Sequence, residues 1–316
     1  MTASLEVIEP GLLTTVQDTG RRGYQRFGVP VSGAMDPLAL RLANALVGND
    51  LGEAALEMTI GGPSLRFQDE RVVAVTGADL DPKLNGQSVP MWEAVLVRRG
   101  AVLHFGWRRS GCRAYLAVAG GFDVPIILGS KSTYLRGGFG GWKGRALQAG
   151  DVLPLGAAIS DFGRHLGKCL SHEHVPKYEE AMVVRAVLGP QDDWFTPEAV
   201  STFLRTRYLV SASSDRMGCR LEGRPLTLGD RREFVSDGVA LGSVQVPAGG
   251  QPIILMADRQ TVGGYPKIAT VISADISLVA QSFPGVTHLE FVACTVEKAR
   301  QVLATQQGLI ERVRSM

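Results

Sequence analysis

The chain has 316 residues, of which 45% are hydrophobic and 20% are charged, so its composition is that of a globular protein and excludes disorder. Its formal net charge is +2, without a block of like charges, so nothing indicates a nucleic-acid-binding protein. The N-terminal run has no signal-peptide pattern, no apolar stretch is long enough to span a membrane, and the four cysteines form no Cys-x-x-Cys pair, so we expect a cytoplasmic protein with reduced thiols.

Short β-rich runs separated by tight turns dominate the first half of the chain. Glycine and proline, at 38 and 16 residues, punctuate these runs, a texture typical of barrels or sandwiches. A helix is predicted after Asp36, because its carboxylate can cap a helix whose first residue is Pro37, and Gly48 should end it. The strand-like runs are residues 71–76, 94–97, 101–105 and 114–118.

The second half repeats this texture after a polar segment. Residues 157–181 contain three of the five histidines and few strand formers, which is typical of a linker or crossover. A second helix should begin at Thr196-Pro197, and a polar, periodic helix should close the chain over residues 296–313. The sequence therefore predicts a mainly β protein with a few helices, in two domains over residues 1–160 and 182–316, with a linker over residues 161–181.

A polar run near the N-terminus, residues 15–24, is the first candidate binding segment. Asp18 could orient Arg21 through a charge-assisted hydrogen bond and leave guanidinium donors for a substrate carboxylate or phosphate. The same residues would also suit an Asx-type turn with a surface ion pair. The run therefore predicts either a substrate-binding pair or a solvated turn.

Glycine-rich stretches between residues 120 and 145 form the second candidate. Glycine lets backbone N–H groups converge on an anion, and serine hydroxyls supply further donors. The spacing is not that of a P-loop, and a flexible barrel loop is the alternative to an anion cradle. The residues expected to bind phosphate are Ser130, Ser132, Gly138, Gly140 and Gly141.

Charged and amide side chains gather in the second half of the chain. Residues 257–267 lie between two apolar runs, and a loop held by a rigid strand pair is a common place for a site. Guanidinium and ammonium groups there could bind a carboxylate or phosphate, while the amides suit an amide or ureido group. A hairpin with solvated charges is the alternative. The candidate residues are Arg216, Gln245, Asp258, Arg259, Gln260, Tyr265 and Lys267.

Common catalytic and metal-binding motifs are missing from the sequence. It has no G-x-S-x-G elbow, no H-E-x-x-H motif and no Rossmann fingerprint after a strand. His165, Cys169, His172 and His174 lie close in sequence, but their irregular spacing in a polar segment is typical of solvated side chains. We therefore expect no metal site in this chain.

Motifs spread over nearly the whole chain resemble those of one family. They are residues 17–21, 28–30, 32–36, 47–49, 129–133, 215–218 and 258–266. In this order they resemble the allophanate hydrolase subunit 2 family, also called the biotin-dependent carboxyltransferase family or the family of the C subunit of 5-oxoprolinase. Val262 departs from the pattern, which has a small or hydroxylated residue there. The resemblance implies two linked cyclophilin-like β-barrel domains.

The resemblance also implies a function within a complex. The leading interpretation is a subunit of an ATP-dependent 5-oxoprolinase, a hydrolase that opens the cyclic amide of 5-oxoproline to give glutamate. A subunit-1 partner, a third subunit, and ATP with Mg²⁺ would then be needed. One alternative is a carboxyltransferase subunit for urea- or allophanate-type substrates, to which biotin on a separate carrier protein would deliver the carboxyl group. Another is a regulatory antagonist that binds a kinase-inhibitor partner.

Residue chemistry suggests roles for the candidates within such a reaction. A lactam is a poor electrophile, so its oxygen would be phosphorylated, and positive groups would stabilise the transferred charge. The expected roles are Arg216 and Arg259 for phosphate or substrate carboxylate, Lys267 for charge neutralisation, Gln260 with Tyr265 for the amide, and Asp258 or Asp18 as orienter or base.

Overall fold

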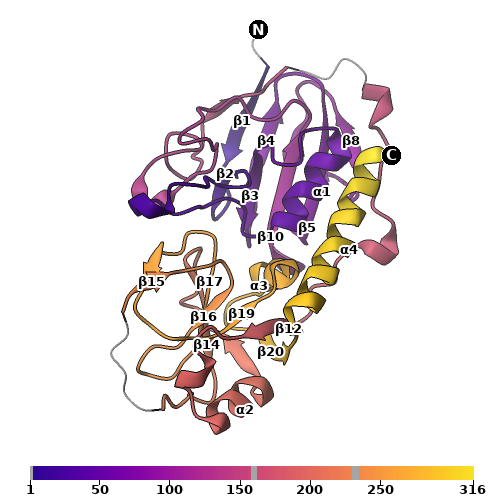
Figure 1. The fold of residues 1–316 in the computed structure, drawn as a ribbon. Helices are drawn as coiled ribbons and strands as arrows, with labels where there is room; N and C mark the ends of the chain where they lie inside the picture. Colours follow the sequence, from indigo (N-terminus) through magenta and orange to yellow (C-terminus); the bar gives the residue numbers. More distant parts are fainter. Residues whose placement is uncertain (1–2, 158–161, 230–234) are drawn as a thin grey trace. The chain divides into compact units, whose positions relative to one another are not determined.

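The computed structural model describes residues 3–157, 162–229 and 235–316, which fold as two compact units (Figure 1). The first unit comprises Met1–Arg21, Ser32–Lys177 and Gln307–Met316, and the second comprises Arg22–Val31 and Tyr178–Gln306. Within these described ranges, no helix has both the length and the apolar character needed to cross a membrane.

The segment expected to be a linker belongs largely to the first unit. Residues 162–177 are grouped with that unit, and Cys169 forms an isolated antiparallel bridge with Glu93. Residues 158–161 lie outside the described part of the chain. One of the boundaries between the units therefore lies near residue 177, and it depends on tertiary contacts of the polar segment and not on its composition.

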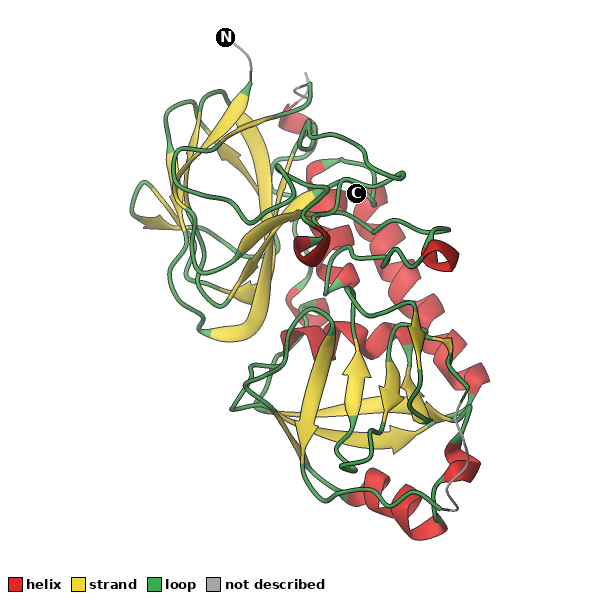
Figure 2. Cartoon of the chain, turned by 90° about the vertical axis from the view of Figure 1, so that its left-hand side faces the viewer, coloured by secondary structure: helices red, strands yellow, loops and turns green. Residues whose placement is uncertain are grey.

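Two antiparallel sheets form the first unit (Figure 2). The six-stranded sheet has the order β11 (Val152–Pro154), β1 (Ser4–Glu9), β4 (Ser64–Phe67), β9 (Val102–His104), β6 (Lys83–Leu84) and β7 (Gln87–Ser88). The five-stranded sheet has the order β2 (Thr14–Gln17), β3 (Ala55–Thr59), β10 (Ser110–Val118), β5 (Arg71–Asp79) and β8 (Ala94–Val97). Alternate side chains from both sheets, such as Leu5, Phe67 and Leu116, form one buried cluster.

Helix α1 (Pro37–Val47) covers part of the five-stranded sheet. The Asp36 carboxylate accepts hydrogen bonds from the N–H groups of Leu38 and Ala39, and Gly48 ends the helix in the left-handed conformation, so the predicted helix and both of its boundaries are confirmed. Apolar side chains of α1 pack with those of β5 and β10 in a second buried cluster. Ile310 and Val313 of α4 (Val296–Ser315) join this cluster, and α4 is the predicted closing helix.

The second unit contains a closed seven-stranded barrel, and all of its strands except β13 are labelled in Figure 1. Its order is β12 (Ala181–Leu188), β19 (Lys267–Val271), β16 (Ser243–Gln245), β17 (Ile253–Leu255), β14 (Gly218–Glu222), β13 (Tyr208–Val210) and β20 (His288–Ala293), and β20 closes it by parallel pairing with β12. Phe203 of α2 (Pro197–Arg205) stacks on Phe291 at 4.4 Å between ring centroids. Helix α3 (Ile276–Gln281) and the ribbon of β15 (Asp237–Gly238) and β18 (Val262–Gly263) complete the unit. The predicted class, mainly β with a few helices, is confirmed.

Candidate functional site

Asp18, at the end of β2, is the centre of a buried hydrogen-bond cluster in the first unit. Its Oδ1 accepts hydrogen bonds from the Gly20 N–H and the Ser130 hydroxyl, both at 2.7 Å, and from the Ser132 hydroxyl. Its Oδ2 accepts one from the Lys131 N–H at 2.6 Å. Since Asp18 is 8% exposed and both of its oxygens are engaged, the geometry makes it the anchor of the loop at residues 130–132.

Arg21 belongs to the same cluster, which we call the Asp18 cluster (Asp18, Arg21, Ser130 and Ser132). Arg21 is fully buried, donates to the carbonyl oxygen of Ser132, and lies 4.9 Å from the centroid of the Phe139 ring. Gly140 has a φ of +75°, and a Cβ there would overlap the same carbonyl and lie 2.7 Å from the Arg21 guanidinium. Glycine at 140 therefore lets the loop close over Arg21.

The remaining glycines predicted for phosphate binding use their N–H groups within the loop. Gly141 donates to the Lys131 carbonyl at 3.1 Å, while the exposed Gly138 donates to the carbonyls of Tyr134 and Leu135. Each of these N–H groups closes a turn. Together with the serine hydroxyls, they therefore do not point at a common anion-binding position. In the first unit, the Ser130 and Ser132 hydroxyls and the Gly138 and Gly141 N–H groups thus donate within the loop that Asp18 anchors.

Arg216 and Asp258 form a buried ion pair in the second unit. The Arg216 Nε lies 2.9 Å from Asp258 Oδ2, its Nη2 lies 3.1 Å from Oδ1, and the Asp258 N–H donates to the Arg216 carbonyl at 2.8 Å. The two residues are 7% and 4% exposed. A two-point pair of this kind fixes both side chains, so Asp258 is suited to orient Arg216 and the turn that precedes Arg259.

Arg259 differs from Arg216 in its partners. Its Nε donates to the Val239 carbonyl at 3.1 Å and its Nη1 to the Met256 carbonyl at 3.2 Å, and among the described residues no carboxylate forms an ion pair with it. Burial, and to a smaller degree the charge of Arg22, lowers the pKa of Arg259 from 12.5 to about 10. The side chain is therefore a fixed, half-buried cation that keeps its charge at neutral pH.

The next residue after this cation, Gln260, belongs to a pair of glutamine amides. Gln260 Nε2 donates to Gln245 Oε1 at 3.2 Å, and Gln245 Nε2 donates to the Tyr265 carbonyl at 3.4 Å. A Cβ on Gly263 would lie 2.5 Å from Gln245 Nε2 and 3.4 Å from Gln260 Nε2, so glycine leaves room for both amides. Tyr265 contributes its backbone to this arrangement, and its side chain is half exposed.

Lys267, at the start of β19, already has an acidic neighbour. Its Nζ lies 3.3 Å from Asp237 Oδ2 and 3.4 Å from the Gly238 carbonyl, and the residue is 2% exposed. The Gly238 N–H and then the Lys267 ammonium lower the pKa of Asp237. Lys267 therefore holds the ribbon of β15 and β18. Among the charged candidates of the second unit, Arg216 and Lys267 each have a carboxylate beside them. Arg259 is a cation that forms no ion pair with a carboxylate of the described residues.

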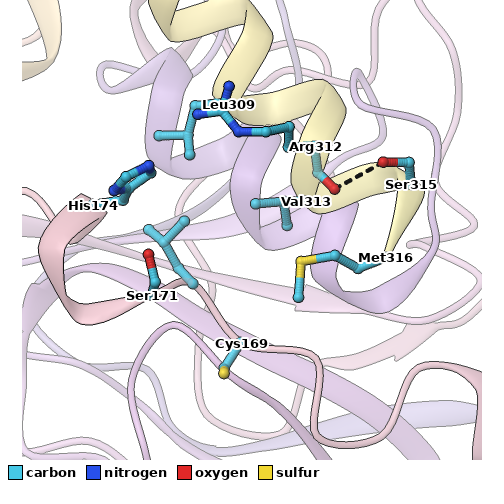
Figure 3. A pocket seen from close by; sticks show the side chains of 9 residues that line it. Cys169, Ser171, His174, Leu309, Arg312, Val313, Ser315 and Met316 are labelled. Carbon is cyan, nitrogen blue, oxygen red and sulfur yellow. Dashed lines mark hydrogen bonds between the residues drawn. The ribbon is translucent and has the colours of Figure 1, made fainter.

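A cavity of about 400 Å³ lies at the end of α4, against the segment after Lys168 (Figure 3). Cys169, His174, Arg312 and Met316 are among its lining residues, and none of the predicted site residues lines it. Over the described ranges, no group of three or more His, Cys, Asp or Glu side chains could hold a metal ion. The candidate site is therefore defined by the side chains around Arg259.

Arg22 was not predicted as a site residue. It belongs to the second unit, and its charge acts on Arg259 across more than 200 residues of sequence, so no local pattern could link the two. The feature of the sequence that could have indicated Arg22 as a candidate is its position directly after Arg21 in the polar run of residues 15–24.

Similarity to named proteins extends over nearly the whole chain. The model of the carboxyltransferase domain, subdomain A and B, matches residues 27–293. The C subunit of 5-oxoprolinase from Escherichia coli (strain K12) is 40% identical over 98% of this chain and 97% of that protein. The urea amidolyase of Saccharomyces cerevisiae is 36% identical over 98% of this chain and 18% of that protein.

A solved structure shares the fold. The K. lactis urea amidolyase matches 99% of this chain with a TM-score of 0.93 and 33% sequence identity. This chain spans 20% of that solved chain. Together these matches confirm the family resemblance predicted from the sequence motifs.

Proposed function

Because the chain belongs to the family of carboxyltransferase domains with subdomains A and B, we propose that it is a subunit of an ATP-dependent 5-oxoprolinase. In this reaction the cyclic amide of 5-oxoproline is hydrolysed to glutamate by a complex with a subunit-1 partner and a third subunit. The observation that supports the proposal is sequence identity, since the chain is 40% identical to the C subunit of E. coli 5-oxoprolinase and 36% identical to the yeast urea amidolyase, each over 98% of this chain.

The charge of the site also supports this substrate. 5-Oxoproline carries a carboxylate, whereas urea is neutral. Arg259 offers a fixed guanidinium that donates to two carbonyl groups, and its charge is not balanced by an ion pair among the described residues. A half-buried cation of this kind is stabilised by an anionic ligand, and we assign the substrate carboxylate to it.

Gln260 is the residue that we propose for recognition of the lactam. Its Nε2 donates to Gln245 Oε1, and this hydrogen bond fixes the orientation of the Gln260 amide, so that Oε1 points away from Gln245. The Oε1 of Gln260 is then the acceptor that a lactam N–H requires. The proposal therefore assigns the substrate carboxylate to Arg259 and the lactam N–H to Gln260.

ATP with Mg²⁺ would supply the phosphoryl group that activates a lactam oxygen, but the residues expected to bind phosphate do not suit a nucleoside triphosphate. The hydroxyls of Ser130 and Ser132 donate to Asp18, and the N–H groups of Gly138 and Gly141 close turns. The described residues also include no group of three carboxylates or similar ligands for a metal ion. We therefore assign nucleotide binding to the partner subunits, and the binding and orientation of the substrate to this chain.

The proposal is tested by reconstitution. The chain is co-expressed with its subunit-1 partner and the third subunit, and ATP hydrolysis is measured with and without 5-oxoproline. We expect 5-oxoproline to stimulate hydrolysis, with stoichiometric release of glutamate, and omission of this chain to abolish both. A complete complex in which 5-oxoproline changes neither rate would contradict the proposed function.

A second candidate function is a carboxyltransferase subunit that passes a carboxyl group from biotin on a separate carrier to a urea-like acceptor. The observation that favours it is the similarity in fold to the K. lactis urea amidolyase, at a TM-score of 0.93. Its test is urea-dependent loss of the carboxyl group from a carboxylated biotin carrier when this chain and its partner are added. That result, without stimulation by 5-oxoproline, would replace the leading proposal.

Replacement of Gln260 by leucine should raise the KM for 5-oxoproline. Loss of one hydrogen bond to the lactam costs about 1–2 kcal/mol, which corresponds to roughly a tenfold increase in KM. Steady-state kinetics of the assembled complex measure this effect. Gln301→Leu, on the exposed surface of α4, is the matched control and should leave KM unchanged. Equal KM values for the two variants would exclude Gln260 from lactam recognition.

A further inference from the structure

The ribbon of β15 and β18 lies against the polar side chains of the candidate site. Its two strands pair at two positions, Asp237 with Gly263 and Gly238 with Val262. A Cβ on Gly263 would lie 2.5 Å from Gln245 Nε2, so the backbone of β18 packs directly on this amide. Because a two-stranded ribbon is marginally stable by itself, its position depends on the side chains that it contacts.

Lys267 and Arg259 both hydrogen-bond to the backbone of this ribbon or to the residue that follows β15. The Lys267 Nζ donates to the Gly238 carbonyl at 3.4 Å, and the Arg259 Nε donates to the Val239 carbonyl at 3.1 Å. Gly238 and Val239 are consecutive, so the two cations attach to one short piece of backbone. The cations suited to bind a substrate anion are therefore the same groups that hold the ribbon in place.

Asp237 places a carboxylate directly beside the Lys267 ammonium. Its Oδ2 lies 3.3 Å from Nζ, and the Asp237 side chain is 64% exposed whereas the Lys267 side chain is 3% exposed. The Gly238 N–H donates to Oδ1 of Asp237 at 2.7 Å. The ammonium is held in place by burial, but a mostly exposed carboxylate loses little free energy when it turns to solvent. The Asp237 carboxylate thus fills a position that a ligand oxyanion can take at small cost.

We propose that Lys267 is an oxyanion-binding residue of this site, and that Asp237 is an internal carboxylate that fills the oxyanion position until a ligand displaces it. The ligand is a small oxyanion, either a carboxylate or a phosphoryl group, because both present negatively charged oxygens to an ammonium group. The identity of this oxyanion as the carboxylate of 5-oxoproline, or as a phosphoryl group transferred to it, rests on the proposed function.

Binding to the full chain tests the displacement. The chain is titrated calorimetrically at low ionic strength with 5-oxoproline, with inorganic phosphate, and with the uncharged lactam 2-pyrrolidinone. Asp237→Asn removes the competing charge and keeps a carbonyl acceptor for Lys267. We therefore expect this variant to bind at least one of the two anions about three- to tenfold more tightly than the wild type. Its binding of 2-pyrrolidinone should be unchanged.

Glu222→Gln is the matched control, because Glu222 is an exposed carboxylate on β14 of the same unit. It removes the same net charge and should leave all three affinities unchanged. Lys267→Met keeps the length of the side chain and removes its charge, so in the double variant it should abolish the gain of Asp237→Asn. An equal gain in Glu222→Gln, or a gain that persists without the Lys267 ammonium, would overturn the proposal.

The outcomes separate the displacement from the proposed function. Tighter binding of 5-oxoproline in Asp237→Asn identifies the carboxylate as the ligand, and tighter binding of phosphate alone identifies the phosphoryl group. A complex whose ATP hydrolysis does not respond to 5-oxoproline contradicts the proposed function and leaves either gain in affinity intact. If Asp237→Asn binds both anions no more tightly than the wild type, or if neither chain binds an anion, Asp237 only supports the ribbon and the displacement is rejected.

Discussion

Replacement of Asp258 by alanine should destabilise the second unit by about 3–5 kcal/mol, the range for breaking a buried ion pair by removing one partner. The reason is that Arg216, 7% exposed, would keep its charge without the two carboxylate contacts at 2.9 and 3.1 Å. The turn before Arg259 would also lose its anchor, so substrate binding should fall together with stability.

Hydrogen exchange resolved by segment is the suitable measurement, because the chain has two units and the loss should be confined to one of them. Protection should fall in β14 and β17, which flank the pair, and stay unchanged in β5 and β10 of the first unit. The double variant Arg216→Met/Asp258→Leu removes both charges and should recover much of the lost stability. Glu311→Ala, which removes an exposed ion pair with Arg314 on α4, is the control expected to have no measurable effect. A stable Asp258→Ala variant with unchanged exchange would contradict the proposed anchoring role.

Replacement of Asp18 by alanine should destabilise the first unit by about 3–5 kcal/mol, since each buried donor left without an acceptor costs about 1–3 kcal/mol and hydroxyls can partly re-pair. Four donors, including the backbone N–H groups of Gly20 and Lys131, would lose their acceptor at once. Asp18→Asn should have a smaller effect, because its amide retains one accepting oxygen.

The Asp18 experiment also distinguishes two roles for this residue. If Asp18 anchors the loop, exchange at residues 129–133 should increase in Asp18→Asn even without ligand. If Asp18 binds substrate directly, the same variant would raise KM and leave exchange unchanged, and the anchoring role would be rejected. Asp123→Ala provides the control within the first unit, because this side chain is exposed.

Local features of the sequence predicted much of the fold. The helix from Pro37 to Val47 follows from an Asp cap, a proline at the first turn and a terminal glycine, all within a dozen residues. The mainly β class follows from short apolar runs punctuated by glycine and proline. These predictions succeed because capping, turn geometry and side-chain alternation depend on neighbours in the chain.

The sequence by itself determined the fold class, the positions of α1 and α4, and the family resemblance. Only the tertiary structure decided the partners of the candidate residues. Asp18 meets Ser130 and Ser132 more than 110 residues away, Asp258 meets Arg216 at a separation of 42, and the segment Arg22–Val31 folds with the second unit. The physical reason is that strand register and barrel closure bring distant residues together, and these contacts decide whether a charged side chain anchors a loop or remains available to a ligand.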